Sequence, residues 1–381
     1  MKKKTSYNFA SEVEFVNSGD DFFERANKII RNSLHKIHLQ TYIFSDDSTG
    51  LETIKLLTGA VERGVEVNLL IDAFGSHELK SETIETIKEC GINFRMYSPL
   101  FKGIKLHFGR RLHHKILIAD GKEALIGGIN FDDKYRLKGA DTPWLDFAVY
   151  VKGNICDDIS DMCERLWSKK GYFRRNKKAS KAPTKPQGIL VKLQQNDWLY
   201  RRKGISTSII NALRSAQSSV TLVESYFLPG TRTRVALKNA SKRNVKVRVI
   251  LPGVSDVKVV KNATSYWYAW LLRNNIEIYE WNKTILHGKL IVVDNDWVSI
   301  GSYNINHLSH FSSIETNVEV KDKDFRTKVS WELDRIIQSS KKISNVENEK
   351  RANPLQMFLW WSSFQFVRFM FRFQYAILSK E

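Results

Sequence analysis

The sequence has little cysteine and no evident set of metal ligands. Its 381 residues include three cysteines, Cys90, Cys156 and Cys163, and no two of them have Cys-x-x-Cys spacing. This odd number predicts neither a disulfide framework nor a zinc site, and it fits a reducing compartment. No His, Asp or Glu cluster has the spacing of metal ligands either. We therefore expect chemistry that needs no metal and no cofactor.

Acidic residues are scarce relative to basic ones, and a cleavable leader is not apparent. There are 60 Lys and Arg against 41 Asp and Glu, which gives a formal net charge of +19. This excess favours an anionic partner such as nucleic acid, anionic lipid or a phosphate ester, although a merely soluble basic surface is an alternative. The start, Met1–Lys4, is basic, but no apolar run follows it, so we expect no signal peptide.

One five-point pattern occurs twice in the chain. The first copy comprises His113, Lys115, Asp120, Gly127 and Asn130. The second copy comprises His287, Lys289, Asp294, Gly301 and Asn304. All five matched pairs are separated by the same 174 positions, which chance rarely produces. The repeat indicates a duplicated domain in which each copy donates half of one site, and a chain of this length can form two cores.

The residues around each copy predict how the motif is presented. The apolar runs 116–118 and 290–293 indicate buried strands, and the polar residues after them indicate tight turns. On a strand, His113 and Lys115 would point to one face and His114 to the other. We expect Asp120 and Asp294 to be structural turn residues. We also expect the pairs Gly127-Gly128 and Gly301-Ser302 to allow close backbone approach.

The residue types suit attack on a phosphodiester, whose anionic oxygens repel nucleophiles. Two lysines and two asparagines can hold these oxygens in a preorganised site; they are Lys115, Lys289, Asn130 and Asn304. One histidine can attack phosphorus, and the other can protonate the leaving alkoxide and then deprotonate the incoming alcohol. Each imidazole needs its second nitrogen held. Asp146 and Glu315, each roughly 30 residues after the histidine of its own copy, are the candidates for this role.

Strands and helices alternate on both sides of the motifs. In the first copy we predict strands at 35–44, 65–72, 92–97 and 146–151, and helices at 20–30, 51–63, 82–89 and 158–167. In the second we predict strands at 189–193, 220–227, 245–251, 276–281 and 316–320, and helices at 205–215, 232–242, 259–273 and 324–339. The alternation favours a mostly parallel sheet covered by helices. The predicted domains are 1–173 and 189–345, joined by a basic linker at 174–188 and followed by a membrane-associating segment at 346–381.

The C-terminal segment is rich in aromatic residues. A helix over Leu355–Leu378 would be roughly 36 Å long, enough to cross a bilayer. Arg368 lies near its middle, where a charge costs about 2.5–3.5 kcal/mol on insertion scales. A helix lying in the membrane interface therefore fits better, and a helix docked on the core is the alternative. The expected membrane contacts are Trp360, Trp361, Phe364, Arg368, Phe371 and Arg372.

The duplicated pattern resembles the phospholipase D superfamily, and within it the bacterial cardiolipin synthases of the phospholipase D type. The supporting stretches are 144–147, 225–230, 286–289, 301–304 and 313–320, and the resemblance covers roughly 15–337. It implies an α/β fold of two tandem domains, each a mixed β-sheet flanked by helices, with the active site at their interface. It also implies phosphatidyl transfer from one phosphatidylglycerol to the hydroxyl of another, through a phosphatidyl-histidine, with release of glycerol.

The resemblance implies a role for each histidine and a location for the protein. His113 would be the nucleophile and His287 the acid and base; we do not expect His107 to contact phosphate. The implied partners are phosphatidylglycerol, cardiolipin and the cytoplasmic face of the cell membrane, with no nucleic acid. Alternatives are a hydrolase or a transphosphatidylase with another acceptor, a nuclease of the superfamily, and a non-catalytic lipid-binding protein. The basic charge favours the nuclease, whereas the aromatic tail does not.

Overall fold

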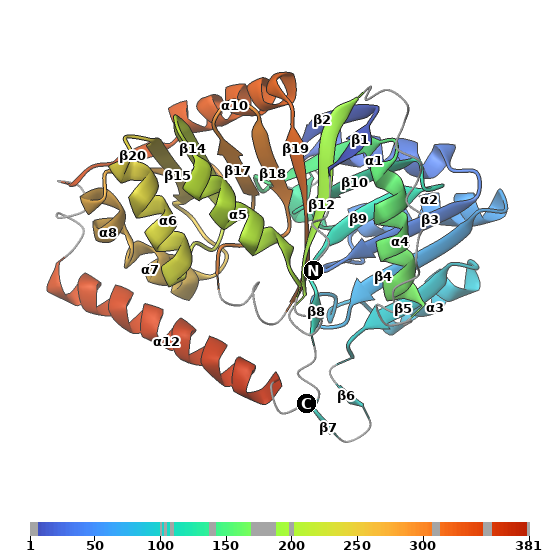
Figure 1. The fold of residues 1–381 in the computed structure, drawn as a ribbon. Helices are drawn as coiled ribbons and strands as arrows, with labels where there is room; N and C mark the ends of the chain where they lie inside the picture. Colours follow the sequence, from blue (N-terminus) through green and yellow to red (C-terminus); the bar gives the residue numbers. More distant parts are fainter. Residues whose placement is uncertain are drawn as a thin grey trace.

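The computed structural model describes residues 7–99, 101–102, 105–106, 110–136, 142–168, 188–197, 202–306, 313–345 and 353–378. The two copies of the repeat form two sheets that lie side by side, with helices around them (Figure 1). The predicted linker falls outside the described residues except for Gly188. His107 falls outside them as well.

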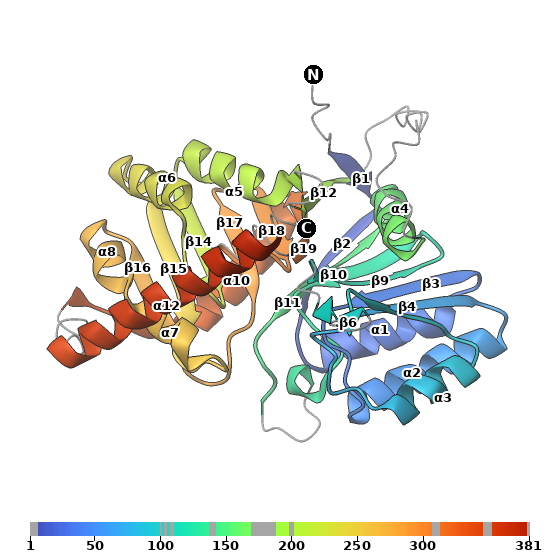
Figure 2. The same ribbon diagram turned by 90° about the horizontal axis from the view of Figure 1, so that it is seen from below.

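The first copy builds a seven-stranded sheet. Its strands, in spatial order, are β2 (Glu12–Asn17), β11 (Phe147–Lys152), β10 (Glu123–Gly127), β9 (Lys115–Ala119), β3 (Lys36–Thr41), β4 (Glu66–Asp72) and β5 (Asn93–Tyr97). One face is covered by α1 (Asp20–Asn32), α2 (Ser48–Glu62) and α3 (Ser81–Glu89), and the other by α4 (Ile155–Trp167) (Figure 2). In α1 the buried side chains recur at helical spacing, so one apolar stripe faces the sheet.

The second copy builds an eleven-stranded sheet. Its main path is β1 (Asn8–Ala10), β12 (Ile189–Asp197), β19 (Ser313–Lys321), β18 (Trp297–Gly301), β17 (Lys289–Val293), β14 (Ser219–Glu224), β15 (Lys246–Pro252), β16 (Glu277–Trp281) and β20 (Lys341–Ile343). Two short strands lie off this path, β13 (Arg202–Lys203) on β12 and β8 (Arg111–Leu112) on β19. The covering helices are α5 (Gly204–Ser215), α6 (Thr231–Lys242), α7 (Lys258–Ser265), α8 (Tyr268–Arg273) and α10 (Lys323–Gln338).

Two local predictions are wrong. The sheets are mixed rather than mostly parallel. Apart from the short pairing of β8 with β19, only β3–β4–β5 and β14–β15–β16 run parallel, and these are joined by helical crossovers. The motif strands are joined by tight turns and therefore run antiparallel. The helix predicted over 259–273 is broken between α7 and α8. Tyr266 and Trp267, the two residues at the break, both contact Phe364.

The two copies share one hydrophobic core. A single buried cluster includes Ile116 and Val149 from the first sheet, Leu290 and Val318 from the second, and residues of α4 and α10. The first strand, β1, also pairs with β12 of the second sheet. An apolar interface of this kind holds the copies in a fixed relation, so a site between them is rigid. The predicted fold of two tandem domains with mixed sheets flanked by helices is confirmed.

Candidate active site

A parallel pairing between the copies positions His113. Strand β8 pairs with the start of β19, and the His113 amide donates to the Ile314 carbonyl at 3.0 Å. The next residue, Glu315, places its Oε2 2.9 Å from His113 Nδ1. Glu315 is buried and also accepts a hydrogen bond from the Ser302 hydroxyl. Burial by itself raises the pKa of Glu315, but His113 and Lys115 outweigh it, and the pKa lies below its ordinary value.

A second pairing positions His287 in the same way. Leu145 and Leu286 form a parallel bridge, and the His287 amide donates to the Leu145 carbonyl at 2.8 Å. Asp146 follows Leu145, is buried, and has its Oδ2 2.6 Å from His287 Nδ1. A buried carboxylate at this nitrogen fixes the tautomer with the proton on Nδ1, which leaves the lone pair of Nε2 for chemistry. Lys289 Nζ lies 3.2 Å from Nε2.

The carboxylates therefore cross between the copies. The pairing expected from the sequence, of each histidine with the carboxylate of its own copy, is wrong. His113 of the first copy binds Glu315 of the second, and His287 of the second binds Asp146 of the first. The reason is geometric, because each carboxylate follows directly on the segment that pairs across the interface beside the other copy's histidine.

The two lysines lie buried against the histidines. Lys115 Nζ donates to the His113 carbonyl at 2.6 Å, and Lys289 Nζ lies 3.6 Å from the Asp146 carboxylate and 2.7 Å from His287 Nδ1. Burial, with the Lys289 ammonium nearby, lowers the pKa of Lys115 to about 7. Burial also lowers the pKa of Lys289. Cations held out of water in this way are suited to binding an anion, which would favour their charged forms.

The two motif asparagines are buried and oriented by their neighbours. Asn130 Oδ1 accepts from the Ile43 amide at 3.1 Å, and its Nδ2 donates to the Tyr135 hydroxyl at 2.9 Å. Asn304 Oδ1 accepts from the Ser225 hydroxyl at 2.7 Å. Because both amide oxygens are already engaged, the amide N–H groups are the ones that can face a phosphate oxygen.

Three tyrosines at the histidines were not identified from the sequence. The ring of Tyr42 packs edge-on against His113, with centroids 4.9 Å apart. Tyr135 and Tyr226 pack against His287 at 5.6 and 6.1 Å. These rings restrict how each imidazole can turn. Tyr42 and Tyr226 each follow a strand whose end lies near a motif lysine, and this shared position is the signal that could have revealed them.

Glu224 is a further buried carboxyl group that the sequence did not reveal. It lies at the end of β14, opposite Lys289 in the antiparallel register. Its Oε2 accepts from the Ile305 amide at 3.1 Å, and Oε1 has no hydrogen-bond partner among the described residues. Burial raises the pKa of Glu224 to about 8, so the group is mostly protonated at neutral pH. Asp146 forms an ion pair with Lys289 at 3.6 Å and so balances its charge.

The motif aspartates lie in the turns after the motif strands, with positive φ at both Asp120 and Asp294. The Asp120 carboxylate accepts three backbone N–H groups, from Leu34, His35 and Lys36. The Asp294 carboxylate accepts three more, from Gln217, Ser218 and Ser219. Each aspartate thereby ties its turn to the start of a neighbouring strand. Gly128 has a different local task, because a Cβ there would overlap the Asp146 carboxylate.

Asp120→Ala should destabilise the fold without touching the chemistry. We expect the free energy of unfolding at pH 7 to fall by about 2 kcal/mol, because three backbone donors lose an ionised acceptor. Those hydrogen bonds outweigh partial burial and hold the pKa of Asp120 below its ordinary value. The stabilisation is therefore complete above about pH 4 and is lost as the pH falls through the lower, folded pKa.

Urea unfolding at several pH values measures this effect, with the exposed Glu62→Ala as the control that should change little. Asp294→Ala should behave as Asp120→Ala does. If Asp120→Ala were as stable as the wild type but had a lower kcat, the structural role of Asp120 would be contradicted.

His114 lies beside the motif but does not face the paired histidines. His114 is buried with Nε2 2.9 Å from Gln40 Oε1, and burial lowers its pKa to about 3. It therefore points away from the paired histidines, toward α4 and β3. Within the described ranges, no group of three or more His, Cys, Asp or Glu is arranged to hold a metal ion.

Comparison with known proteins identifies the family. The family described as "Cardiolipin synthase, PLD-like domain" matches residues 27–150 and 209–337, one segment in each copy. The chain belongs to this phospholipase D-like family, as the repeated motif predicted.

Individual relatives agree with this assignment. Cardiolipin synthase B of Escherichia coli (strain K12) is 28% identical over 381 residues, covering 96% of this chain and 90% of the relative. A probable cardiolipin synthase of Bacillus subtilis (strain 168) is 28% identical, covering 91% and 70%. The crystal structure of phosphatidylserine synthase from Haemophilus influenzae Rd KW20 superposes with a TM-score of 0.77 at 13% identity, covering 98% of this chain and 97% of that one. At this identity the last likeness concerns the fold alone.

Proposed function

We propose that the chain is a cardiolipin synthase that joins two phosphatidylglycerol molecules and releases glycerol. The observation that carries the proposal is the pair of crossed contacts, in which two buried carboxylates each hold one motif histidine, beside two buried lysines. Relatives named cardiolipin synthase B match this chain over nearly its full length. Phospholipids are thus the substrate class, and phosphatidylglycerol is the particular donor and acceptor that we propose.

In the first half-reaction His113 Nε2 attacks the phosphorus of one phosphatidylglycerol. The bond from phosphorus to the glycerol oxygen breaks, and His287 gives that oxygen a proton, so free glycerol leaves. Glu315 keeps the Nδ1 proton of His113 in place and balances the positive charge that the ring gains. The lysines and asparagines hold the non-bridging oxygens.

In the second half-reaction His287 takes the proton from a hydroxyl of the second phosphatidylglycerol. That oxygen attacks phosphorus, the bond to His113 breaks, and cardiolipin leaves. Burial lowers the pKa of His113, which keeps the nucleophile neutral. Burial, reinforced by the Lys289 ammonium, also lowers the pKa of His287, and a bound phosphodiester anion raises it again toward the value that an acid needs.

The test is to incubate the purified chain with vesicles of phosphatidylglycerol labelled in both the glycerol headgroup and the acyl chains. We expect cardiolipin and free glycerol in equal amounts, because each transfer releases one headgroup. Phosphatidic acid as the main product would indicate that water is the acceptor and the chain a hydrolase. Cleavage of an oligonucleotide with no turnover of lipid would indicate a nuclease.

The same assay tests the prediction that the reaction needs no metal. Activity should be unchanged in excess EDTA, because the proposed steps use only histidine, lysine, asparagine and carboxylate groups. Complete loss of activity in EDTA, with recovery on addition of a divalent cation, would contradict the proposed chemistry.

We further propose that α12 (Pro354–Leu378) holds the enzyme on the membrane surface. None of the helices in the described part of the chain is long and apolar enough to cross a bilayer. α12 lies against α7, with Phe364 stacked on Tyr266 at 4.8 Å and Val367 buried (Figures 1 and 2). Elsewhere on its surface α12 exposes large apolar side chains, namely Leu355, Met357, Phe358, Leu359, Trp361, Phe366, Phe369, Met370 and Phe373.

The structure changes the expected set of membrane contacts. Phe364 packs against Tyr266 and Trp267 and is partly buried, so we propose the exposed residues of α12 as the main lipid contacts. Trp361 and Arg368 are exposed, and Trp360 is partly buried. The side chains of Phe371 and Arg372 lie outside the described residues. The helix thus docks on the domain with one side and presents the opposite side to a bilayer on, as we propose, the cytoplasmic face.

Replacing Phe358 and Phe369 together by serine should weaken binding to vesicles of anionic lipid by at least about tenfold, because two large rings no longer enter the interface. Sedimentation with vesicles measures the effect. The matched control replaces two exposed apolar residues of the first domain, Leu34 and Leu51, by serine. Equal binding by the two double variants would show that α12 is not the anchor.

A further inference from the structure

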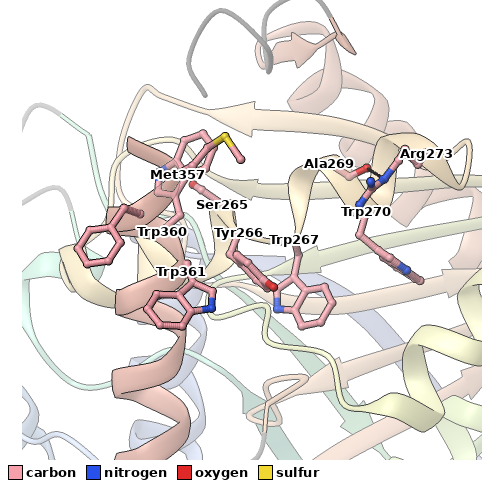
Figure 3. Close-up of a pocket in the computed structure, with 10 residues that line it drawn as sticks. Ser265, Tyr266, Trp267, Ala269, Trp270, Arg273, Met357, Trp360 and Trp361 are labelled. Atoms are coloured by element: carbon pink, nitrogen blue, oxygen red, sulfur yellow. Dashed lines mark hydrogen bonds between the residues drawn. The ribbon is translucent and has the colours of Figure 1, made fainter. Parts of the chain in front are cut away.

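A cavity of about 580 Å³ lies between α12 and the broken helix pair α7–α8 (Figure 3). The aromatic rings of Tyr266, Trp267 and Trp270 form one side, and those of Phe358, Trp360 and Trp361 form the other. A cavity of this volume with mostly apolar walls has the size of a small-molecule site. The active-site residues do not line it, so the catalytic mechanism leaves it without a role.

The cavity has one cationic residue and no acidic one in its lining. Arg273 stands at the last turn of α8, and its Nε donates to the Ala269 carbonyl of its own helix at 3.2 Å (Figure 3). None of the ion pairs resolved in the described part of the chain includes Arg273. A guanidinium beside an apolar cavity suits a ligand with an anionic group at the end of a hydrocarbon chain.

The cavity is also continuous with the apolar side of α12 proposed to face the membrane. Met357, Phe358 and Trp361 line it and are at the same time 55, 63 and 46% exposed. A hydrocarbon chain could therefore pass from a bilayer into the cavity along these apolar side chains. A water-soluble ligand would have no need of such an entrance.

We propose that this cavity is an accessory lipid site, which takes one acyl chain of an anionic phospholipid and binds its phosphate at Arg273. The inference rests on the proposed function in that it needs the protein to work on phospholipid membranes. The bound chain would fill the space between α12 and α7–α8. It would hold the helix at the surface by a contact separate from the two catalytic histidines.

The test uses the full chain on vesicles that contain phosphatidylglycerol with a photoreactive diazirine in one acyl chain, followed by mass spectrometry of the peptides. We expect adducts on Tyr266, Trp270 and Met357. Ala269→Trp, which fills the cavity from its exposed edge, should lower these adducts at least about tenfold while adducts on Phe369 persist. Ala269→Leu is a milder second variant and should give a smaller loss in the same direction.

The anionic contact is tested by charge reversal. Arg273→Glu should lower the same adducts, and Arg214→Glu, the same change in the last turn of α5, should not. Photoreactive phosphatidylcholine should label the cavity less than phosphatidylglycerol does. Equal labelling by the two lipids, or unchanged labelling in both Ala269 variants, would overturn the proposal.

Two measurements distinguish a lipid in the cavity from a second copy of the chain, and the accessory site from the proposed function. If a second copy of the chain filled the cavity, the wild type would sediment as a dimer in the absence of lipid, and Ala269→Trp would sediment as a monomer. This result would also overturn the proposal. Turnover of monomeric, short-chain phosphatidylglycerol should be the same in Ala269→Trp as in the wild type. If the wild type turns over phosphatidylglycerol but its cavity is not labelled, only the accessory site is refuted. If the wild type does not turn over phosphatidylglycerol at all, the proposed function is refuted.

Discussion

His113→Ala should lose on the order of 10⁴-fold or more of the turnover, because no other group replaces the nucleophile that forms the covalent intermediate. His287→Ala should lose about 10²–10⁴-fold, the typical contribution of a positioned acid and base. Each histidine lies beside a buried carboxylate of the other copy, so each variant removes one partner from a fixed pair.

A substrate with a nitrophenol leaving group distinguishes the two roles. Nitrophenolate leaves without protonation, so His287→Ala should release one equivalent in a burst and then stall, with the lipid phosphate trapped on His113. His113→Ala should show no burst. His77→Ala changes an exposed histidine and serves as the control. A trapped adduct on His287 would reverse the assignment, and turnover near that of the wild type in either variant would rule out a shared site.

The strands and turns of the two motifs could be predicted from the sequence because their spacing is local. A strand, a tight turn and a returning strand are contained in about 20 residues, and the turn at Asp120 and the close approach at Gly128 follow from residue type. The repeat then predicts a second, equivalent hairpin. The mixed order of the sheets could not be read in the same way, because it depends on which distant strands become neighbours.

The partners of the histidines could not be predicted for the same reason. Two short pairings, β8 with β19 and Leu145 with Leu286, connect segments that lie far apart in the chain. Sequence separation pointed to the carboxylate of the same copy, whereas the fold brings the carboxylate of the other copy to each ring. In the tail, Phe358 and Phe364 are the same residue type, and only the packing of α12 on α7 makes the first exposed and the second partly buried.

The crossed arrangement makes the two copies dependent on each other. Each half contributes one histidine, one lysine, one asparagine and one carboxylate to the site, but each carboxylate acts on the histidine of the other half. Neither copy by itself therefore contains a complete pair. The shared core of both sheets, which includes Ile116 and Leu290 beside the motifs, keeps the halves in the register that the contacts require.

Asp146→Asn should behave like His287→Ala, although Asp146 belongs to the first copy and His287 to the second. An asparagine at this position cannot balance an imidazolium and can favour the wrong tautomer, a change that costs on the order of 10⁴-fold in a comparable histidine–carboxylate pair. The lipid phosphate should again accumulate on His113, because the second half-reaction lacks its base. Glu315→Gln should instead slow the formation of the adduct, since Glu315 holds His113.

Rapid-quench measurement of the adduct and of the nitrophenol burst separates these outcomes. Glu123→Gln, which changes a carboxylate hydrogen-bonded to Tyr150 away from the site, is the matched control and should leave both unchanged. The pH profile adds a readout that a purely structural defect would not move, because loss of the Asp146 charge should lower the pKa that His287 contributes to kcat. The opposite result would be that Asp146→Asn slows formation of the adduct and Glu315→Gln slows its breakdown. With His113 established as the nucleophile, that result would mean that each carboxylate acts on the histidine of its own copy. The crossed pairs would then not be the arrangement used in catalysis.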